Sequence, residues 1–246
     1  MFSNKNVIIT GANKGIGKEI LLLFAKNNAN IIACTRKKDD TFQNEINNIS
    51  KDNNINITNI NFDYSTIDEV KESANYIIKN FEKIDVLINN AGVIDTSLFQ
   101  MTKLSKIREI FEINFFAQLE FTQIILKKMI KNQSSSIINI SSTAAMDPVS
   151  GRIAYSASKS SIITFSKILS KELAKFKVRV NVIAPGLTET ELMRKSHSDE
   201  VVEDVLKNIS LGRIGNTRDV ANLALFLASD KSDYINGQVI RIDGGM

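Results

Sequence analysis

Tyr155 and Lys159 are the residues whose types and spacing most directly suggest chemistry. They stand four positions apart in a segment that reads as a helix, so their side chains would lie on one face. A phenol has a reference pKa near ~10, too high for proton transfer at neutral pH, and a neighbouring ammonium favours the phenolate and lowers that pKa. A shift of about three units would correspond to roughly 4 kcal/mol. A long helix can contain this spacing by chance, so the pair indicates proton transfer only if other residues support it.

Ser142 and Asn114 are two further candidates for the same site. Ser142 follows the strand-like run Ile137–Ser141, at the carboxyl edge where α/β sheets bind ligands. Its hydroxyl could hydrogen-bond a substrate oxygen and stabilise developing alkoxide charge. Asn114 lies among apolar neighbours inside the helical stretch 103–131, where asparagine is mildly unfavourable. It is either a functional residue or an ordinary surface residue.

A glycine-rich turn, Thr10-Gly11-Ala12-Asn13-Lys14-Gly15-Ile16-Gly17, follows the first strand-like segment and leads into a helix. Glycines let the backbone turn tightly and let a diphosphate approach, and the first N–H groups of the helix favour an anion. The spacing is G-x-x-x-G-x-G rather than G-x-G-x-x-G. Tight turns also need glycine for structural reasons alone, but the position after the first strand favours phosphate binding.

The end of the second strand-like segment indicates which dinucleotide would bind. Enzymes that use NAD place an acidic residue there for the ribose hydroxyls, whereas this chain reads Cys34–Lys37 with no acid before Asp39. Arg36 could clamp a ribose 2′-phosphate with paired N–H donors, and Lys14 could reach the same phosphate. The sequence therefore favours NADPH over NADH, although each cation by itself could equally be solvated surface charge.

The elements that must position these residues alternate between short apolar runs and amphipathic stretches. Continuous Val/Ile/Leu runs are typical of a parallel sheet covered on both faces. We therefore predict one α/β domain over residues 1–246, a Rossmann-type doubly wound parallel sheet of about seven strands with helices on both faces. The predicted strands are Asn6–Thr10, Asn30–Thr35, Ile55–Phe62, Ile84–Asn89, Ser136–Ser141, Val178–Ala184 and Gln238–Asp243. The predicted helices are at about 16–27, 39–51, 66–80, 103–131, 153–176 and 217–229.

Two local features refine this outline. Ser65, with Asp68 three residues later, resembles the N-cap of the third helix and its returning acid. The segment 187–212 interrupts the alternation, is polar and partly helical, and contains His197, the single histidine. A long insertion after a strand end is where a substrate lid would lie, so we predict a short lid there and interpret His197 as a solvated residue.

Composition argues against several other classes of protein. The net charge of +4 is spread along the chain, and the basic run Arg36–Lys38 is followed directly by the acidic residues Asp39 and Asp40. No basic patch is formed, so we expect no nucleic-acid binding. The single Cys34 excludes an internal disulfide and a multi-cysteine zinc site, and no His/Asp/Glu cluster suggests another metal site. No apolar run reaches the ~20 residues that cross a bilayer, and the first residues leave no room for a signal peptide. We therefore expect a cytoplasmic protein without membrane contact.

Together these motifs resemble those of the short-chain dehydrogenase/reductase family, over essentially the whole chain. The matching segments are T-G-x-x-x-G-x-G at Thr10–Gly17, N-N-A-G at Asn89–Gly92, Y-x-x-x-K at Tyr155–Lys159 with Ser142 upstream, and P-G at Pro185–Gly186. Each motif is weak alone, but the ordered set at family spacing is specific. The resemblance implies an enzyme that moves a hydride between NADP(H) and a carbonyl or alcohol carbon.

The resemblance also implies a role for individual residues. Tyr155 would be the general acid in reduction, Lys159 would lower its pKa and bind the nicotinamide ribose, Ser142 would orient the carbonyl, and Asn114 would hold a water of the proton relay. Asp63 would lie by the adenine, Asn90 by the adenosine ribose, and Thr188 and Thr190 by the nicotinamide amide. The full set of expected cofactor-binding residues is Gly11, Asn13, Lys14, Gly15, Ile16, Gly17, Arg36, Asp63, Asn90, Ala91, Gly92, Tyr155, Lys159, Pro185, Gly186, Thr188 and Thr190. A homotetramer is expected.

Within the family the chain is most similar to the β-ketoacyl-acyl-carrier-protein reductases. The segment from Leu211 to Met246 follows their pattern, and the predicted lid has their length. The two positions at which that group carries arginines for docking the carrier protein fall at Gln133 and Phe176. The nearby lysines that would supply positive charge instead are Lys127, Lys128, Lys131, Lys175 and Lys177. The leading hypothesis is thus an NADPH-dependent 3-oxoacyl-thioester reductase with the acyl carrier protein as partner. The alternatives are a reductase of a sugar, polyol or other small ketone and, more remotely, a non-catalytic NADPH-binding protein.

Overall fold

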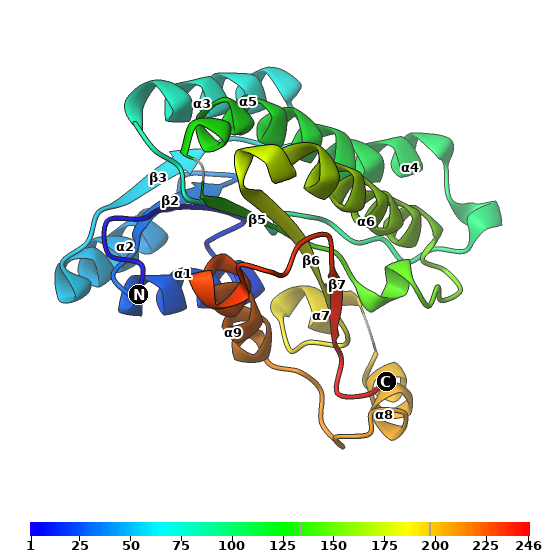
Figure 1. The fold of residues 1–246 in the computed structure, drawn as a ribbon. Helices are drawn as coiled ribbons and strands as arrows, with labels where there is room; N and C mark the ends of the chain where they lie inside the picture. Colours follow the sequence, from blue (N-terminus) through cyan, green and yellow to red (C-terminus); the bar gives the residue numbers. More distant parts are fainter. Residues whose placement is uncertain (133, 197) are drawn as a thin grey trace.

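The computed structural model describes residues 1–132, 134–196 and 198–246, and in these ranges seven parallel strands form one sheet (Figure 1). The strand order is β3-β2-β1-β4-β5-β6-β7, so the direction of winding reverses between β1 and β4. The strands are β1 Asn6–Thr10, β2 Asn30–Thr35, β3 Ile57–Asn61, β4 Val86–Asn89, β5 Ser135–Ile140, β6 Val178–Pro185 and β7 Val239–Ile242. The predicted seven-stranded parallel sheet is confirmed, with every strand boundary within two residues of its predicted position.

Continuous apolar runs form these strands because both faces of the sheet are buried. Ile8 and Ile9 are adjacent on β1 and point to opposite faces, and neither is exposed to solvent. Ile9 belongs to the core under α1 Gly15–Lys26, and Ile8 to the core under α3 Ile67–Asn80. A strand buried on both sides has no polar face, which is why its sequence does not alternate.

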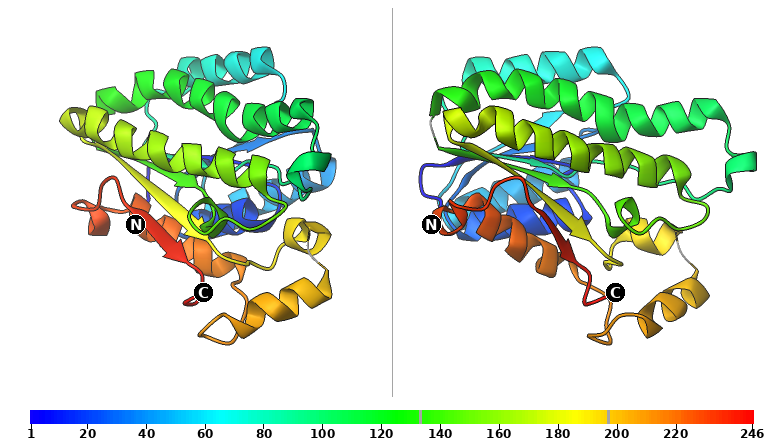
Figure 2. Two further views of the ribbon diagram at one scale, coloured as in Figure 1. Left: turned by 90° about the vertical axis from the view of Figure 1, so that its right-hand side faces the viewer. Right: turned by 45° about the vertical axis from the view of Figure 1, so that its right-hand side comes forward.

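The helices divide into two layers, one on each face of the sheet (Figure 2). One layer holds α1, α2 Asp40–Asn53 and α9 Thr217–Ala228, and the other holds α3, α5 Ala117–Asn132 and α6 Ile153–Leu173. The predicted doubly wound arrangement is therefore confirmed. After α6 a 3-10 turn, Ala174–Phe176, completes the predicted stretch 153–176.

The predicted helix 103–131 is helical along its length but is not one regular α-helix. It consists of α4 Leu104–Phe111, a π-helical turn at Glu112–Phe116, and α5. The π turn surrounds Asn114, whose side chain is fully buried. Such single-turn insertions are frequent at functional sites because they redirect one side chain without ending the helix. Hydrophobic periodicity does not reveal a one-residue change of this kind.

The N-cap expected at Ser65 was wrong. The N-cap of α3 is Thr66, and Ser65 instead donates from its N–H and its Oγ to Asp63 Oδ1, at 2.9 and 2.8 Å. The Asp63 carboxylate, two residues upstream, accepts both hydrogen bonds from Ser65 and forms a side-chain turn before the helix begins. The Ser65 hydroxyl therefore does not cap the helix.

The predicted lid segment 187–212 contains two short helices beyond the carboxyl end of β6, α7 Glu191–Ser196 and α8 Asp199–Lys207. Its start pairs with the segment before α9 through a parallel bridge between Thr188 and Gly215. His197 lies outside the described residues. Among the helices that the structure describes, none is long and apolar enough to cross a membrane.

Candidate active site

A cleft of about 740 Å³ opens at the carboxyl ends of the strands, where the winding of the sheet reverses. Ligands of doubly wound sheets bind at this point because loops diverge there and leave a crevice. Most of the predicted site residues line it, namely Gly11, Asn13, Lys14, Gly15, Ile16, Asn90, Ala91, Gly92, Ser142, Tyr155, Lys159, Pro185, Gly186, Thr188 and Thr190. The remaining four, Gly17, Arg36, Asp63 and Asn114, are not among its lining residues.

In the glycine turn, the backbone at Gly17 lies very close to the backbone at Gly11. Gly11 and Gly15 have φ of +66° and +54°, which favours glycine. A Cβ at Gly17 would overlap the carbonyl oxygen of Gly11. The Asn90 amide donates to Thr10 O at 2.9 Å, and Thr10 Oγ1 accepts from the backbone N–H groups of Asn90 and Ala91 at 2.9 Å each. Thr10 was missed as a site residue, although it stands in the motif, because its contribution is to the shape of the turn.

The start of α1 fits the diphosphate of a dinucleotide. Its N-cap, Lys14, has an extended backbone, and no side chain in the described ranges caps the first turn. These N–H groups adjoin the cleft through Gly15 and Ile16, where the helix dipole favours an anion. Lys14 is mostly exposed, and its Nζ lies 3.9 Å from a Glu191 carboxylate oxygen.

Arg36 and Asp63 come together at the carboxyl ends of β2 and β3. Arg36 Nε lies 3.9 Å from Asp63 Oδ2, a loose pair with the guanidinium largely exposed. Exposed pairs of this kind contribute little to stability, so the guanidinium can turn toward another anion at small cost. The structure thus brings together the two residues predicted for the 2′-phosphate and the adenine.

Tyr155 and Lys159 lie in the first turns of α6, close to Ser142 after β5. Burial raises the pKa of Tyr155 above its usual value, while a hydrogen bond from Ser142 and the charge of Arg152 act in the opposite direction. Burial lowers the pKa of Lys159 to about 8. That Lys159 lowers the pKa of Tyr155 stays a prediction. The Lys159 ammonium donates to Ile140 O at 2.7 Å, and desolvation is the larger effect on both groups.

Asn114 supports the site from behind rather than lining the cleft. Its Oδ1 accepts from Val93 N at 2.8 Å, and its Nδ2 donates to Val93 O at 2.9 Å and to Ser158 Oγ at 3.1 Å. A Cβ on Gly92 would come within 3.2 Å of Asn114 Oδ1 and 3.4 Å of Lys159 Nζ. Asn114 thus fixes the loop after β4 beside the Lys159 ammonium, and its water-holding role stays a prediction.

The other half of the cleft has largely apolar walls. They are formed by the loop after β4, the loop after β5, the lid helices and the end of the chain, with Val93, Ile94, Val149, Leu187, Leu192, Met193, Val201, Val205 and Met246 among the lining residues. Arg241 joins two of these parts, the loop after β5 and the end of the chain, because its guanidinium donates to Asp147 Oδ2 at 2.6 Å, Asp243 Oδ2 at 2.6 Å and Met246 O at 3.0 Å. Met246 and Arg241 were missed, since no local motif links the end of the chain to the loop after β5.

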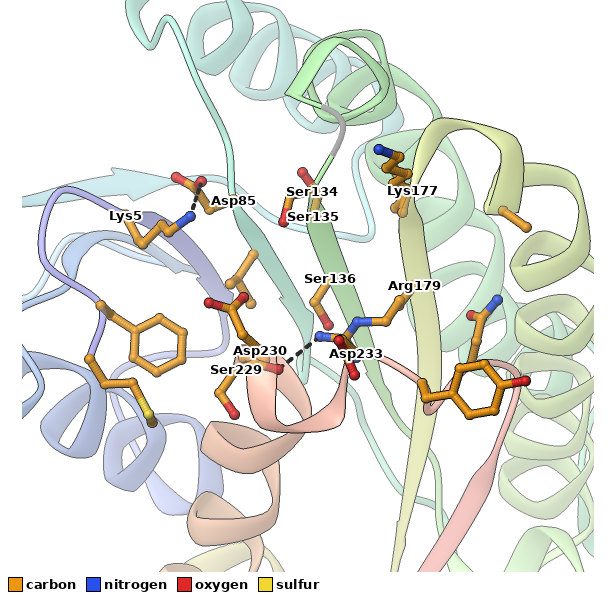
Figure 3. Close-up of a pocket in the computed structure, with 18 residues that line it drawn as sticks. Lys5, Asp85, Ser134, Ser135, Ser136, Lys177, Arg179, Ser229, Asp230 and Asp233 are labelled. Carbon is orange, nitrogen blue, oxygen red and sulfur yellow. Dashed lines mark hydrogen bonds and ion pairs between the residues drawn. The ribbon is translucent and has the colours of Figure 1, made fainter.

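A second cavity, of about 500 Å³, lies at the opposite, amino-terminal edge of the sheet (Figure 3). It contains charges of both signs, including Lys5, Asp85 and Arg179, and Arg179 donates to the carbonyl oxygens of Leu227 and Ser229 at 2.9 and 3.2 Å. None of the predicted catalytic or cofactor-binding residues, all of which the structure describes, lines this cavity. The chemistry suggested by the sequence therefore belongs to the cleft at the carboxyl edge.

Comparison with known proteins agrees with this geometry. The family model for short chain dehydrogenases matches residues 5–201. A 3-oxoacyl-[acyl-carrier-protein] reductase of Thermotoga maritima is 36% identical over 244 residues, covering 98% of this chain and 97% of that protein. The corresponding reductase of Chlamydia trachomatis serovar D is also 36% identical, over 243 residues, with 99% and 97% coverage.

Solved structures share the same fold over almost the full length. A putative NAD(P)-dependent gluconate 5-dehydrogenase from Beutenbergia cavernae, with bound NADP, superposes with a TM-score of 0.92 at 28% identity, covering 99% of this chain and 96% of the other. YwfH, an NADPH-dependent reductase involved in bacilysin biosynthesis, gives 0.90 at 26% identity, with 99% and 98% coverage. The chain therefore belongs to the short-chain dehydrogenase family and is an oxidoreductase that uses a nicotinamide cofactor.

Proposed function

We propose that this enzyme reduces the ketone of a 3-oxoacyl thioester, carried on acyl carrier protein, with NADPH. The observation that carries the proposal is the position of Tyr155 and Ser142 between the glycine turn and an apolar pocket in a single cleft. Such a pocket suits an acyl chain, and hydroxyl groups in the same cleft suit a carbonyl oxygen. Full-length similarity to curated 3-oxoacyl-[acyl-carrier-protein] reductases supports the same substrate class.

The side chains divide the chemistry of reduction between them. When bound, the reduced nicotinamide would supply the hydride. Tyr155 remains protonated at neutral pH because burial raises its pKa, so it can donate a proton to the carbonyl oxygen. Ser142 donates a hydrogen bond to the same oxygen and orients it. The Lys159 ammonium stabilises the phenolate that is left after proton transfer.

The charges after β2 and in the glycine turn support NADPH rather than NADH. Arg36 stands where an NAD enzyme would carry an acid, and its loose pairing with Asp63 leaves the guanidinium able to bind a 2′-phosphate. Lys14 adds a second cation beside the glycine turn. One structural neighbour, the gluconate 5-dehydrogenase-like protein, contains NADP.

A basic surface supports the carrier protein as partner. Gln133 lies outside the described residues, and Phe176 occupies the 3-10 turn after α6, so no arginine stands at either position. One lysine lies in that turn and one directly follows it, and three stand on α5, which the turn contacts. They are Lys127, Lys128, Lys131, Lys175 and Lys177. These cations offer an acidic carrier the same sign of charge as the expected arginines.

The experiment that tests the function follows NADPH oxidation at 340 nm with acetoacetyl-CoA and with an acetoacetyl-loaded carrier protein. We expect turnover of the thioester, with Tyr155→Phe lowering kcat by at least ~10²-fold because the proton donor is lost. NADPH binding, followed by cofactor fluorescence, should persist in the variant. An enzyme inactive on both thioesters but active on sugars or simple ketones would contradict the proposed substrate.

That second substrate class, a sugar, polyol or other small ketone, has its own support. Phe176 replaces an expected carrier-docking arginine, and the gluconate 5-dehydrogenase-like neighbour shares the fold over 99% of this chain. The same panel of substrates distinguishes the two functions. The cytoplasmic location is also a proposal, tested by fractionation of cells that produce the protein.

A further inference from the structure

A short segment after β7, residues 243–246, packs against the last part of the lid, and we call it the strap. The carbonyl oxygen of Gly244 accepts from Leu211 N at 3.0 Å. The carbonyl oxygen of Gly245 accepts from Ser210 Oγ at 2.8 Å. Both glycines have positive φ, +69° and +82°, and a Cβ on Gly244 would come within 2.7 Å of a lid side chain. The strap is therefore fixed to the lid just beyond α8, and Figure 1 shows the chain passing from β7 to this position.

Arg241 links the strap to the loop after β5. Its guanidinium donates to two oxygen atoms of the strap, Asp243 Oδ2 at 2.6 Å and Met246 O at 3.0 Å. The same guanidinium donates to Asp147 Oδ2 at 2.6 Å, in the loop that follows Ser142. Exposed ion pairs contribute little singly, but a guanidinium held by three acceptors forms a network with defined geometry. One side chain therefore connects the loop after β5, through the strap, to the lid.

The connected segments form a wall of the apolar part of the cleft. Asp147 and Met246 line the cleft, together with Val149 of the same loop and Val201 of α8. The loop and the lid come from different parts of the sequence, so the contacts of Arg241 help to set the distance between them. An acyl chain that is too long for the pocket would collide with this wall. Closely packed walls resist extra methylene groups, and pockets discriminate between substrates on that basis.

We propose that Arg241 limits the length of the acyl chain that the enzyme accepts, by holding the strap and the loop after β5 together. The inference rests on the proposed reduction of 3-oxoacyl thioesters and specifies the short-chain members of that class as the preferred substrates. Loss of the link should allow the wall to move outward, since Met246 is unbranched and adapts its shape to the space available. The Asp147 carboxylate is 61% exposed, so water can solvate it when its partner is removed.

A short and a long substrate, acetoacetyl-CoA and 3-oxododecanoyl-CoA, test the proposal when NADPH oxidation is followed at 340 nm. We expect the wild type to have the higher kcat/KM for the short thioester. Arg241→Met keeps the length of the side chain but removes every donor. It should raise the ratio of long-chain to short-chain kcat/KM about tenfold, because room for a few methylene groups changes discrimination on this scale. A general loss of activity cancels in this ratio.

A second variant breaks the same link from the other side. Asp147→Ala removes only the contact with the loop after β5 and changes an exposed residue, so it tests the proposal even if Arg241→Met does not fold. It should raise the ratio in the same direction. The double variant should show little further increase over Arg241→Met, because both substitutions remove one interaction.

Arg218→Met is the matched control. Arg218 pairs with Glu19 Oε1 at 2.7 Å and so joins α9 to α1, and it is not among the residues that line the cleft. This variant loses an arginine–carboxylate pair between two elements, as Arg241→Met does, but it should leave the ratio at the wild-type value. Thermal unfolding of each variant establishes that it is folded.

The outcomes separate this inference from the proposed function. If the ratio does not change in Arg241→Met and Asp147→Ala, if it rises equally in Arg218→Met, or if the wild type prefers the long thioester, the chain-length limit is overturned and the thioester function stands. If the wild type reduces no thioester, the thioester function is wrong, and the same ratio measured with methyl acetoacetate and methyl 3-oxododecanoate decides the inference by itself. If no 3-oxo compound is reduced, both are overturned.

Discussion

At Tyr155 and Lys159, burial acts on two ionisable groups that stand one helical turn apart. It raises the pKa of the phenol and lowers that of the ammonium to about 8. The Tyr155 phenol therefore stays protonated at neutral pH, while Lys159 loses its proton near pH 8. A reductase needs a neutral Tyr155 and a charged Lys159, so the lysine sets the upper pH limit of this site.

We expect kcat/KM for ketone reduction to fall as the pH rises through about 8, because Lys159 loses its charge there. Initial rates of NADPH oxidation between pH 6 and 10 measure this fall, the alkaline limb of the pH profile. In Lys159→Arg, which stays charged, the limb should disappear from whatever activity remains. A wild-type profile that is flat to pH 10 would contradict the assignment.

The same burial predicts a change of stability with pH, and its sign follows from the folded pKa lying below the ordinary 10.5. Between about pH 8 and 10.5 the unfolded chain binds more protons at Lys159 than the folded chain, so this residue makes the free energy of unfolding rise over that window. The total rise is roughly 3 kcal/mol. Below pH 8 the buried Lys159 ammonium lowers the free energy of unfolding by this amount. Urea unfolding of the wild type and of Lys159→Met at several pH values isolates this contribution.

Arg36 should determine the choice between the two dinucleotides. Arg36→Ala is expected to raise the KM for NADPH about tenfold and to leave the KM for NADH nearly unchanged, because only NADPH carries the 2′-phosphate. Lys38→Ala is a matched control, since Lys38 is exposed nearby and pairs with Asp40 at 3.7 Å. Equal effects of Arg36→Ala on both cofactors would contradict a phosphate clamp.

At the scale of elements, the start of α1 depends on a close approach between two glycines. A Cβ at Gly17 would overlap Gly11 O and come within 2.6 Å of Asn90 Nδ2, so Gly17→Ala must move the turn. We expect a loss of stability of about 1–3 kcal/mol, as in other overpacked sites, together with weaker NADPH binding. Thermal unfolding and a fluorescence titration measure the two effects.

Gly212→Ala provides the control for this substitution. Gly212 has φ +65°, but an added Cβ would meet nothing within 4 Å. The variant should lose only the roughly 1 kcal/mol of a left-handed non-glycine residue and bind NADPH normally. If Gly17→Ala and Gly212→Ala behave alike, the close approach in the turn is unimportant.

At the scale of the whole molecule, the exposed apolar side chains predict an assembly. Phe116 in the π turn and Ile168 on α6 are 52% and 53% exposed, and both belong to the helical layer on one face of the sheet (Figure 2). The π turn contacts α6, and large exposed apolar side chains on adjoining helices are a feature of subunit contacts. This pattern supports the homotetramer expected from the family resemblance, with these helices between subunits.

Light scattering coupled to gel filtration tests the tetramer. We expect the wild type to have the mass of four chains, and Ile168→Asp to shift the mass toward smaller species, because a charge would be buried in the contact. Lys175→Asp, an exposed change in the adjoining turn, should keep the tetramer. A wild type that elutes as a monomer at micromolar concentration would refute the assembly.

The sequence by itself determined the order of the elements and the parallel sheet, and most of the site residues that it predicted line the cleft. It did so because apolar runs, glycine spacing and the Tyr155–Lys159 spacing are local properties that survive in any environment. Strand ends are fixed by the same runs, so the positions after β1, β4 and β5 were predictable. The π turn at Asn114 was not, since it changes a helix by a single residue.

Only the tertiary structure decided the charges and the walls of the site. The pKa values of Tyr155 and Lys159 depend on how much water the surrounding loops exclude, which no spacing encodes. Arg152 at the start of α6 contacts the lid because its guanidinium donates to Ser196 O at 3.4 Å across the cleft. Met246 becomes part of the wall because Arg241 binds both its carbonyl oxygen and Asp147, although Asp147 and Met246 are far apart in the sequence. Burial and long-range contact are properties of the folded chain, whereas motif and periodicity are properties of the sequence.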